Sequence, residues 1–305
     1  MPTKKLSTSI SPKGVKFLEL CAAMYNKAQL SDEPNDSAQI LNENGDFPNK
    51  LFELIQECSS TNKYAEQIVN SNYTYPGEYK GPKEITEQIK ALGKLFGIST
   101  AEALEYAKTL PALPEGAEGW FAIPRVEAIG AKFFPAITDP VERYCQAVNF
   151  VLEKLGKSRK FHNYRAGAID KQHLRGNSRT IAMFGEVKQQ QQAGDILIIA
   201  GQLGMRHRGK SVNRARETFS GNEYGLGAFA VICIALVHPE RLVRTEELDM
   251  DCAGDDFAPD GDGDFSRSPL LRFSDDEVGF GAKGLSNAHK YYGSASGFVP
   301  QPLVS

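Results

Sequence analysis

Residues 204–211 match the phosphate-loop pattern G-x-x-x-x-G-K-[ST] at every fixed position. In a working loop the glycines let backbone N–H groups surround a phosphate, Lys210 would reach the terminal phosphates and Ser211 would hold Mg²⁺. The surroundings weaken this interpretation, because the four variable positions are bulky (Met-Arg-His-Arg) and no apolar strand ending in Asp follows to hold the metal. Two alternatives stay open: a nucleotide-binding loop, or a basic turn that pairs with some other anion.

Aspartates are concentrated between positions 249 and 264. In Leu-Asp-Met-Asp-Cys (248–252), strand alternation would place Asp249 and Asp251 on one face and the apolar residues on the other. Two carboxylates so placed can hold a divalent cation for phosphoryl chemistry. The following Asp-Gly-Asp-Gly-Asp resembles the start of a calcium loop, but Phe265 and Leu271 replace the turn glycine and the bidentate Glu, which excludes an EF-hand. A solvated acidic loop is the alternative.

The charges separate along the chain. The whole sequence has 35 Lys and Arg against 38 Asp and Glu, a formal net charge of −3. Residues 154–216 nevertheless carry a net charge of +11, and residues 246–277 carry −10. A basic segment of this kind favours an anion-binding surface, most simply for nucleic-acid or other polyphosphate partners. The alternatives are that it docks on the acidic segment or coats a solvated helix face.

We predict that phosphates contact the basic segment, since the planar fork of Arg fits two phosphate oxygens at once. Interleaved rings (His162, Tyr164, His173 and His207) could stack on unpaired bases. The predicted phosphate-binding residues are Arg159, Lys160, Arg175, Arg179, Arg206, Arg208, Lys210, Arg214 and Arg216. If a helix begins at Arg206, then Arg206, Lys210 and Arg214 share one of its faces.

Two other hypotheses remain. The protein could be a metal-dependent hydrolase of phosphate esters or nucleotides, with Lys210 on the phosphate and Asp249 and Asp251 on a divalent cation. It could instead be a scaffold whose basic and acidic segments pair within or between chains.

The elements that would position these residues form a helical N-terminal region (1–115) and a mixed α/β or α+β domain (116–305). Apolar spacing and capping residues predict helices over 50–58, 64–69, 85–96, 99–110 and 139–156, and a polar helix is expected over 171–192. Strands are expected at 120–123, 195–200, 248–252, 270–273 and 278–280, and the apolar run 228–237 is a buried core element.

The composition is that of a soluble globular protein, and no apolar run has the roughly 20 residues that a membrane helix needs. The five cysteines are scattered without a CxxC pair, which is typical of a reducing compartment and predicts a cytoplasmic protein.

Four stretches of the chain resemble a family of uncharacterised bacterial proteins. They are EGWFAIP (118–124), GDILII (194–199), RHRG (206–209) and GSASGFVPQ (293–301). The resemblance runs over most of the chain and implies a bacterial, intracellular origin. It carries over no activity, ligand or functional residue.

Overall fold

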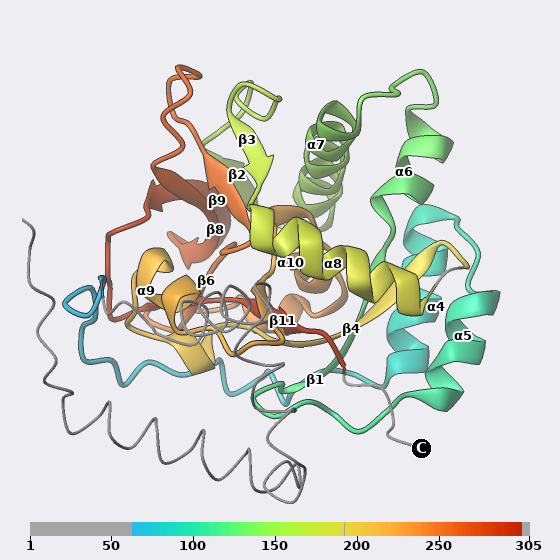
Figure 1. The fold of residues 1–305 in the computed structure, drawn as a ribbon, viewed down its shortest axis with the longest axis horizontal. Helices are drawn as coiled ribbons and strands as arrows, with labels where there is room; N and C mark the ends of the chain where they lie inside the picture. The colour runs from blue at the N-terminus through green and yellow to red at the C-terminus, as the bar shows by residue number, and fades with distance from the viewer. Residues whose placement is uncertain (1–62, 192, 301–305) are drawn as a thin grey trace, which may run out of the picture. The chain divides into compact units, whose positions relative to one another are not determined.

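The computed structural model describes residues 63–191 and 193–300. The chain divides into two units, 1–61 and 62–305, and the described residues belong to the second unit. The predicted helix at 50–58 lies outside the described residues. The fold is mixed α/β, as predicted. Figure 1 shows α4, α5 and α6 at one end of this unit and β2, β3, β8 and β9 at the other.

The helices are α4 (Ile85–Phe96), α5 (Ala101–Tyr106), α6 (Val126–Phe133), α7 (Pro140–Ser158), α8 (Ser178–Gln190), α9 (Val212–Glu217) and α10 (Ala228–Val237), with the 3₁₀ turns η1 (Ala107–Thr109), η2 (Met205–His207) and η3 (Pro239–Arg241). The strands are β1 (Gly119–Pro124), β2 (Phe161–Asn163), β3 (Leu174–Gly176), β4 (Ile196–Gln202), β5 (Glu223–Gly225), β6 (Asp249–Asp251), β7 (Asp255–Phe257), β8 (Arg267–Ser274), β9 (Glu277–Gly284), β10 (Tyr292–Ser294) and β11 (Ser296–Phe298).

Local signals set the ends of two predicted helices. Helix α4 ends at Gly97, whose φ of 64° is the left-handed conformation that glycine adopts without steric cost. Helix α7 begins after Asp139, whose carboxylate accepts a hydrogen bond from the backbone N–H of Glu142 at 2.8 Å. The expected cap at Gly156 is wrong, because α7 continues to Ser158.

Two other predicted helices are wrong in whole or in part. Residues 64–69 form a turn and then extended chain, because Ile68 pairs with Lys210 in an antiparallel bridge. Residues 174–176 form strand β3, which pairs with β7, so that helix α8 begins only at Ser178. In both segments a long-range backbone pairing outweighs the local helical pattern.

The first sheet has the order β1-β4-β11-β5, and all its neighbours are antiparallel. Its strand β4 is buried along all seven residues, as its apolar sequence predicts. Two buried glutamines complete the hydrogen bonding where strand partners are missing. The Gln88 amide bonds the backbone of Trp120 and Ala122 at the edge of β1, and the Gln191 amide bonds both backbone groups of Ile198.

The second sheet has the order β10-β6-β8-β7-β3, and β9 pairs with both β8 and β2. The turn of the β8–β9 hairpin holds Asp275 and Asp276, whose φ values of 54° and 58° fit a two-residue turn with both central residues left-handed. Met250 and Phe280 lie in the hydrophobic core. Asp249 and Asp251 alternate with Met250 and so lie on the opposite face, as predicted.

Residues 292–298 connect the two sheets. Strand β10 pairs with β6, the N–H of Ala295 donates to the Asp251 carbonyl, and β11 then pairs with β4 and β5. Gly293 makes the close approach possible, because a Cβ at this position would lie 2.1 Å from the Gly204 carbonyl oxygen.

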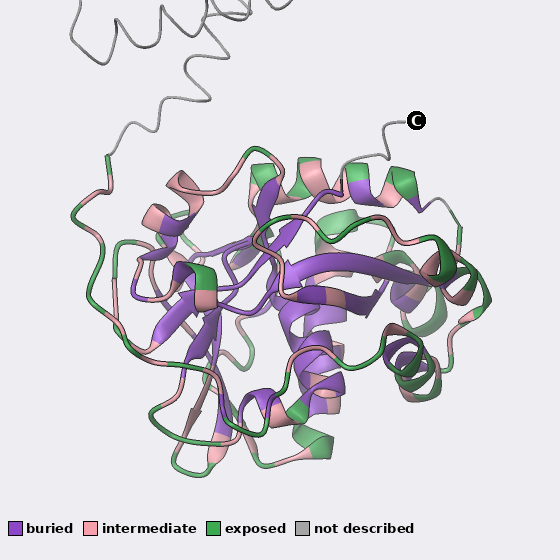
Figure 2. Ribbon diagram, turned by 90° about the horizontal axis from the view of Figure 1, so that it is seen from below, coloured by how far each residue is buried: buried purple, intermediate pink, exposed green. Residues whose placement is uncertain are grey.

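Helix α10 is the core element expected from its apolar sequence. Nine of its ten residues are buried, and it contacts α7, β1 and β8. The Asp255 carboxylate accepts hydrogen bonds at its first turn from the N–H of Ala228 (2.6 Å) and from the Tyr144 hydroxyl (2.7 Å). Figure 2 shows the buried strands and helices in the interior of this unit. Among the described residues, no helix is long and apolar enough to cross a membrane.

Candidate functional site on the polar face of the second sheet

The segment that matches a phosphate loop uses its backbone within the fold. All eight N–H groups of residues 204–211 donate to protein acceptors, two of them to the side-chain oxygen of Gln202 and one to the Tyr75 hydroxyl. The turn η2 covers only Met205–His207, and α9 begins at Val212. No helix runs on from Arg206, so the condition for a shared face of Arg206, Lys210 and Arg214 is not met, and these N–H groups are already paired in this conformation.

The anion of this turn is Glu223, which sequence analysis missed. Its carboxylate has no exposed surface, lies 2.6 Å from His207 Nε2 and 3.2 Å from Arg206 Nε, and accepts from the Ser296 hydroxyl at 2.6 Å. Lys210 Nζ lies 3.3 Å from His207 Nδ1, on the side of the imidazole away from Glu223. Burial alone raises the pKa of Glu223, but the hydrogen bond and the electrostatic attraction of His207, together with the hydrogen bonds from the Ser296 hydroxyl and the Ser220 N–H, lower it to about 2.

Most other predicted phosphate-binding residues also have partners within the fold. Arg159 and Arg179 donate to backbone carbonyls, as does Arg208, which bonds the carbonyl of Tyr73. Arg214 pairs with Glu217 at 2.6 Å. Two cations contact the acidic segment: Arg216 lies 2.7 Å from Asp256, and Arg175 lies 3.8 Å from it.

Lys160 differs from the other eight. It is exposed beside β2, and the structure gives its side chain no partner among the described residues.

Asp249 and Asp251 come together on β6, where both are buried. Burial raises the pKa of Asp249 to about 7 and also raises that of Asp251. Lys283 Nζ lies 3.0 Å from Asp251 Oδ2 and provides the positive charge. Within the described residues, no group of three Asp, Glu, His or Cys side chains is placed to hold a metal ion.

The second acidic stretch forms a turn. The N–H of Asp264 donates to the Asp262 carboxylate at 3.0 Å, and the hydroxyl of Ser266 donates to Asp264 at 2.9 Å. Asp260, Asp262 and Asp264 are exposed, as a solvated loop requires.

The side chains on the side of the second sheet away from the core form what we call the polar face. Arg272 lies opposite Gly279 in the β8–β9 register, and the same alternation brings Gly281 and Lys283 to this face. It comprises His162, Tyr164, Asp249, Asp251, Ser268, Leu270, Arg272, Gly279, Gly281, Lys283, Tyr292 and Ser294.

Aromatic rings and cations alternate at one end of the polar face. The Arg272 guanidinium lies 4.9 Å from the centre of the Tyr164 ring, and the His162 ring lies 4.3 Å from it. Tyr164 is 45% exposed although it packs over Gly279, where a Cβ would lie 3.0 Å from the ring. Arg272 therefore lies over the Tyr164 ring and the tilted His162 ring lies next to it, while part of the Tyr164 side chain stays exposed.

A second aromatic cluster borders the other end of the polar face. His289 stacks on Tyr291 with centroids 5.5 Å apart, and Tyr291 contacts Tyr292 at 4.9 Å. Lys290 is exposed and lies 5.7 Å from the ring of Tyr73. The Lys283 ammonium lies 4.1 Å from the centre of the Tyr292 ring.

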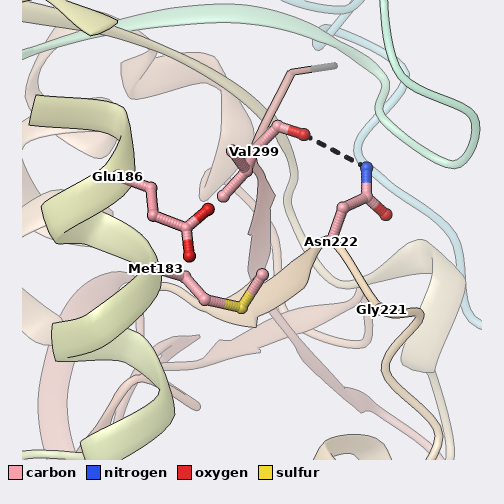
Figure 3. A pocket seen from close by; sticks show the side chains of 5 residues that line it. All are labelled: Met183, Glu186, Gly221, Asn222 and Val299. Carbon is pink, nitrogen blue, oxygen red and sulfur yellow. Dashed lines mark hydrogen bonds between the residues drawn. The ribbon is translucent and has the colours of Figure 1, made fainter. Parts of the chain in front are cut away.

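A separate open pocket of about 480 Å³ lies between α8 and the segment before β5. Figure 3 shows the Glu186 carboxylate and the Met183 side chain projecting from α8 toward Val299, whose carbonyl accepts from Asn222. The pocket holds a single charged group and no ring. It offers fewer binding groups than the polar face.

Comparisons with protein-family models, with curated proteins and with solved structures find no match for this chain. The resemblance to a bacterial family therefore stays a prediction.

Sequence analysis also missed Arg272, Lys283 and Tyr292 on the polar face, and His289 and Tyr291 in the aromatic cluster that borders it. One signal was present, because glycines at 279 and 281 alternate with apolar residues ahead of Lys283. Such alternation predicts a strand with one packed face and one open face.

Proposed function

We propose that the protein binds single-stranded nucleic acid through the polar face of the second sheet. The observation that carries the proposal is the Tyr164 ring, which is 45% exposed, packs against Gly279 of β9 and has the Arg272 guanidinium 4.9 Å from its centre. Proteins that bind single strands combine aromatic rings, on which bases stack, with cations that follow the backbone. The cluster of His289 and Tyr291 beside Lys290 supplies a second platform with the same chemistry.

This proposal keeps the partner class expected from the basic segment and changes the residues that contact it. Within residues 154–216, the proposal uses Lys160, His162 and Tyr164, which lie on or beside β2. The cations already bonded to Glu223, to Asp256 and to backbone carbonyls would have to break those bonds to meet a phosphate.

The test is fluorescence anisotropy of a labelled mixed-sequence single-stranded RNA at several salt concentrations. Affinity should fall steeply with salt, because bound cations release counterions from the phosphates. Tyr164→Ala should weaken binding about five- to a hundredfold, as expected for loss of one stacked base. Arg272→Ala should reduce the slope of log affinity against log salt by about one.

The matched control is Lys90→Ala on α4, which removes an exposed cation from another part of the molecule. Inorganic polyphosphate distinguishes base stacking from phosphate contact alone, since it should compete less well than RNA of equal charge. If RNA does not bind at low salt, or if Tyr164→Ala and Lys90→Ala behave alike, the proposal is wrong.

The hydrolase and scaffold hypotheses each rest on weaker observations than nucleic-acid binding does. The contacts of Arg175 and Arg216 with Asp256 pair the basic and acidic segments at one place within the chain. A hydrolase using Asp249 and Asp251 would need a metal cation to replace the Lys283 ammonium beside Asp251.

An intracellular location belongs to the proposal as well, because the described cysteines Cys145, Cys233 and Cys252 are buried free thiols.

A further inference from the structure

The two aromatic platforms, Tyr164 and the stack of His289 on Tyr291, lie at opposite edges of one part of the second sheet. Tyr164 comes directly after β2, which pairs with β9, and Tyr291 comes directly before β10, which pairs with β6. Strand β8 pairs with both β9 and β6, so the order across this part of the sheet is β2-β9-β8-β6-β10. Since neighbouring strands are about 4.8 Å apart, the four steps separate the platforms by about 19 Å.

A continuous row of side chains joins the two platforms. The Arg272 guanidinium lies 4.9 Å from the centre of the Tyr164 ring. Burial raises the pKa of Tyr292, and the positive charge of Arg272 opposes that rise, so these two side chains are also neighbours. The Tyr292 ring lies 4.9 Å from the Tyr291 ring, which stacks on His289 at 5.5 Å. The row therefore crosses the strands and places a cation between two sets of rings.

Solvent reaches this row at its middle and at both ends. The Tyr164 side chain is 45% exposed, and Arg272 and Tyr291 are partly exposed. Lys160 and Lys290 are exposed beside the first and the second platform, respectively. A ligand can therefore meet rings and cations along the row without opening the core.

The two acids of the polar face are covered. Asp249 is 7% exposed and accepts a hydrogen bond from the Phe273 N–H at 3.0 Å. Asp251 has no exposed surface and lies 3.0 Å from the Lys283 ammonium. Their low exposure leaves the partly exposed Arg272 as the charge that a phosphate would meet midway between the platforms.

We infer that one bound strand crosses the sheet along this row and contacts both platforms, so that the ligand is an oligonucleotide rather than a nucleotide or dinucleotide. This inference rests on the proposed function. At the 3.4 Å spacing of stacked nucleotides, about 19 Å corresponds to about six nucleotides, and a more extended strand needs fewer. A strand long enough to reach both platforms binds more tightly, because its second contact forms at a high effective concentration.

The experiment measures how well unlabelled oligouridines of about 2 to 12 nucleotides displace a labelled dodecamer at low salt. A dinucleotide reaches one platform only. We expect affinity to rise about 10²- to 10⁴-fold from the dinucleotide to the hexamer and to change much less from there to the dodecamer. An affinity that grows by the same factor for each added nucleotide up to the dodecamer would overturn the inference while the proposed function stands. Failure of the dodecamer itself to bind would overturn both.

Variants separate stacking at the second platform from the effect of added phosphates. Tyr291→Ala should weaken binding of the hexamer about five- to a hundredfold. It should change binding of the dinucleotide by no more than about twofold, because Tyr164 still offers a place for it. Tyr291→Leu removes the flat ring but keeps apolar bulk, so it supports the fold if the alanine variant does not, and it should show the same loss.

Phe133→Ala is the matched control. Phe133 is 36% exposed on α6, with the Lys132 ammonium 5.7 Å from its ring, so the variant removes a comparable ring beside a cation in another part of the molecule. It should leave the affinities for the dinucleotide and the hexamer unchanged. If Tyr291→Leu binds the hexamer as tightly as Phe133→Ala does, the strand does not reach the second platform and the inference is wrong.

Discussion

Replacing Glu223 by Gln tests whether the basic turn at 204–211 is held by an internal anion. The substitution keeps the shape of the side chain and removes the charge that faces Arg206 and His207. The fold holds the pKa of Glu223 at about 2, against an ordinary value of 4.5. A difference of that size corresponds to about 3 kcal/mol of preference for the ionised form. Since Gln imitates the protonated form, we expect it to destabilise the protein by about 3 kcal/mol at pH 7.

The assay is urea unfolding followed by the fluorescence of Trp120, the single tryptophan, which lies in β1 next to the buried strand β4. Glu186→Gln is the matched control, because that carboxylate is exposed and no hydrogen bond or ion pair is assigned to it among the described residues. It should change the free energy of unfolding by less than about 0.5 kcal/mol.

The dependence on pH separates the charge from the shape of the side chain. Because the folded pKa of Glu223 lies below its unfolded value, the stabilisation is complete above pH 4.5 and is lost as the pH falls toward 2. The difference between the wild type and Glu223→Gln should therefore shrink over that interval. A difference below about 1 kcal/mol at pH 7, or one that stays constant down to pH 2.5, would refute the internal-anion account.

Three further changes test other parts of the fold. Burial raises the pKa of Asp255 to about 7, so the contribution of this group to stability falls as the pH rises from 4 to 7. Asp255→Asn keeps an acceptor for Ala228 and Tyr144. In urea unfolding, this variant should be more stable than the wild type by about 1–3 kcal/mol at pH 8 and equally stable at pH 4. Gln88→Leu should lower the free energy of unfolding by about 1–3 kcal/mol, since it leaves two backbone groups of β1 unpaired; an unchanged urea midpoint would contradict this role. Gly293→Ala should destabilise more than Gly221→Ala in thermal unfolding, because its Cβ would collide with backbone rather than enter open space; equal melting temperatures would show that the two sheets can separate without cost.

The sequence predicted those elements whose signals are local. Gly97 ends α4, Asp139 begins α7, and the apolar run at 195–200 becomes β4, because a cap or a continuous apolar segment acts on its own neighbours. Elements that depend on distant partners were missed. Strand β3 has only three residues and exists because β7 pairs with it, so its own sequence cannot specify it.

The same limit applies to the candidate site. The count of basic residues in 154–216 was correct, but a count does not show which cations are already bonded. Arg179, for example, donates to three carbonyl groups about 40 positions away, and Arg206 pairs with a carboxylate 17 positions away. The strand that carries Asp249 and Asp251 was predictable from its alternation, whereas Lys283 comes from β9, two strands across the sheet.

The connection at residues 292–298 bears on how the protein folds during synthesis. Strand β11 is the last of the described strands, yet it lies between β4 and β5, and β10 just before it pairs with β6. While the ribosome is still adding these residues, β5 has no neighbour in the first sheet and one side of β6 is open. Such non-local pairing is slow to form and leaves strand edges exposed. We therefore expect chains that are stopped before residue 292 to remain dependent on chaperones.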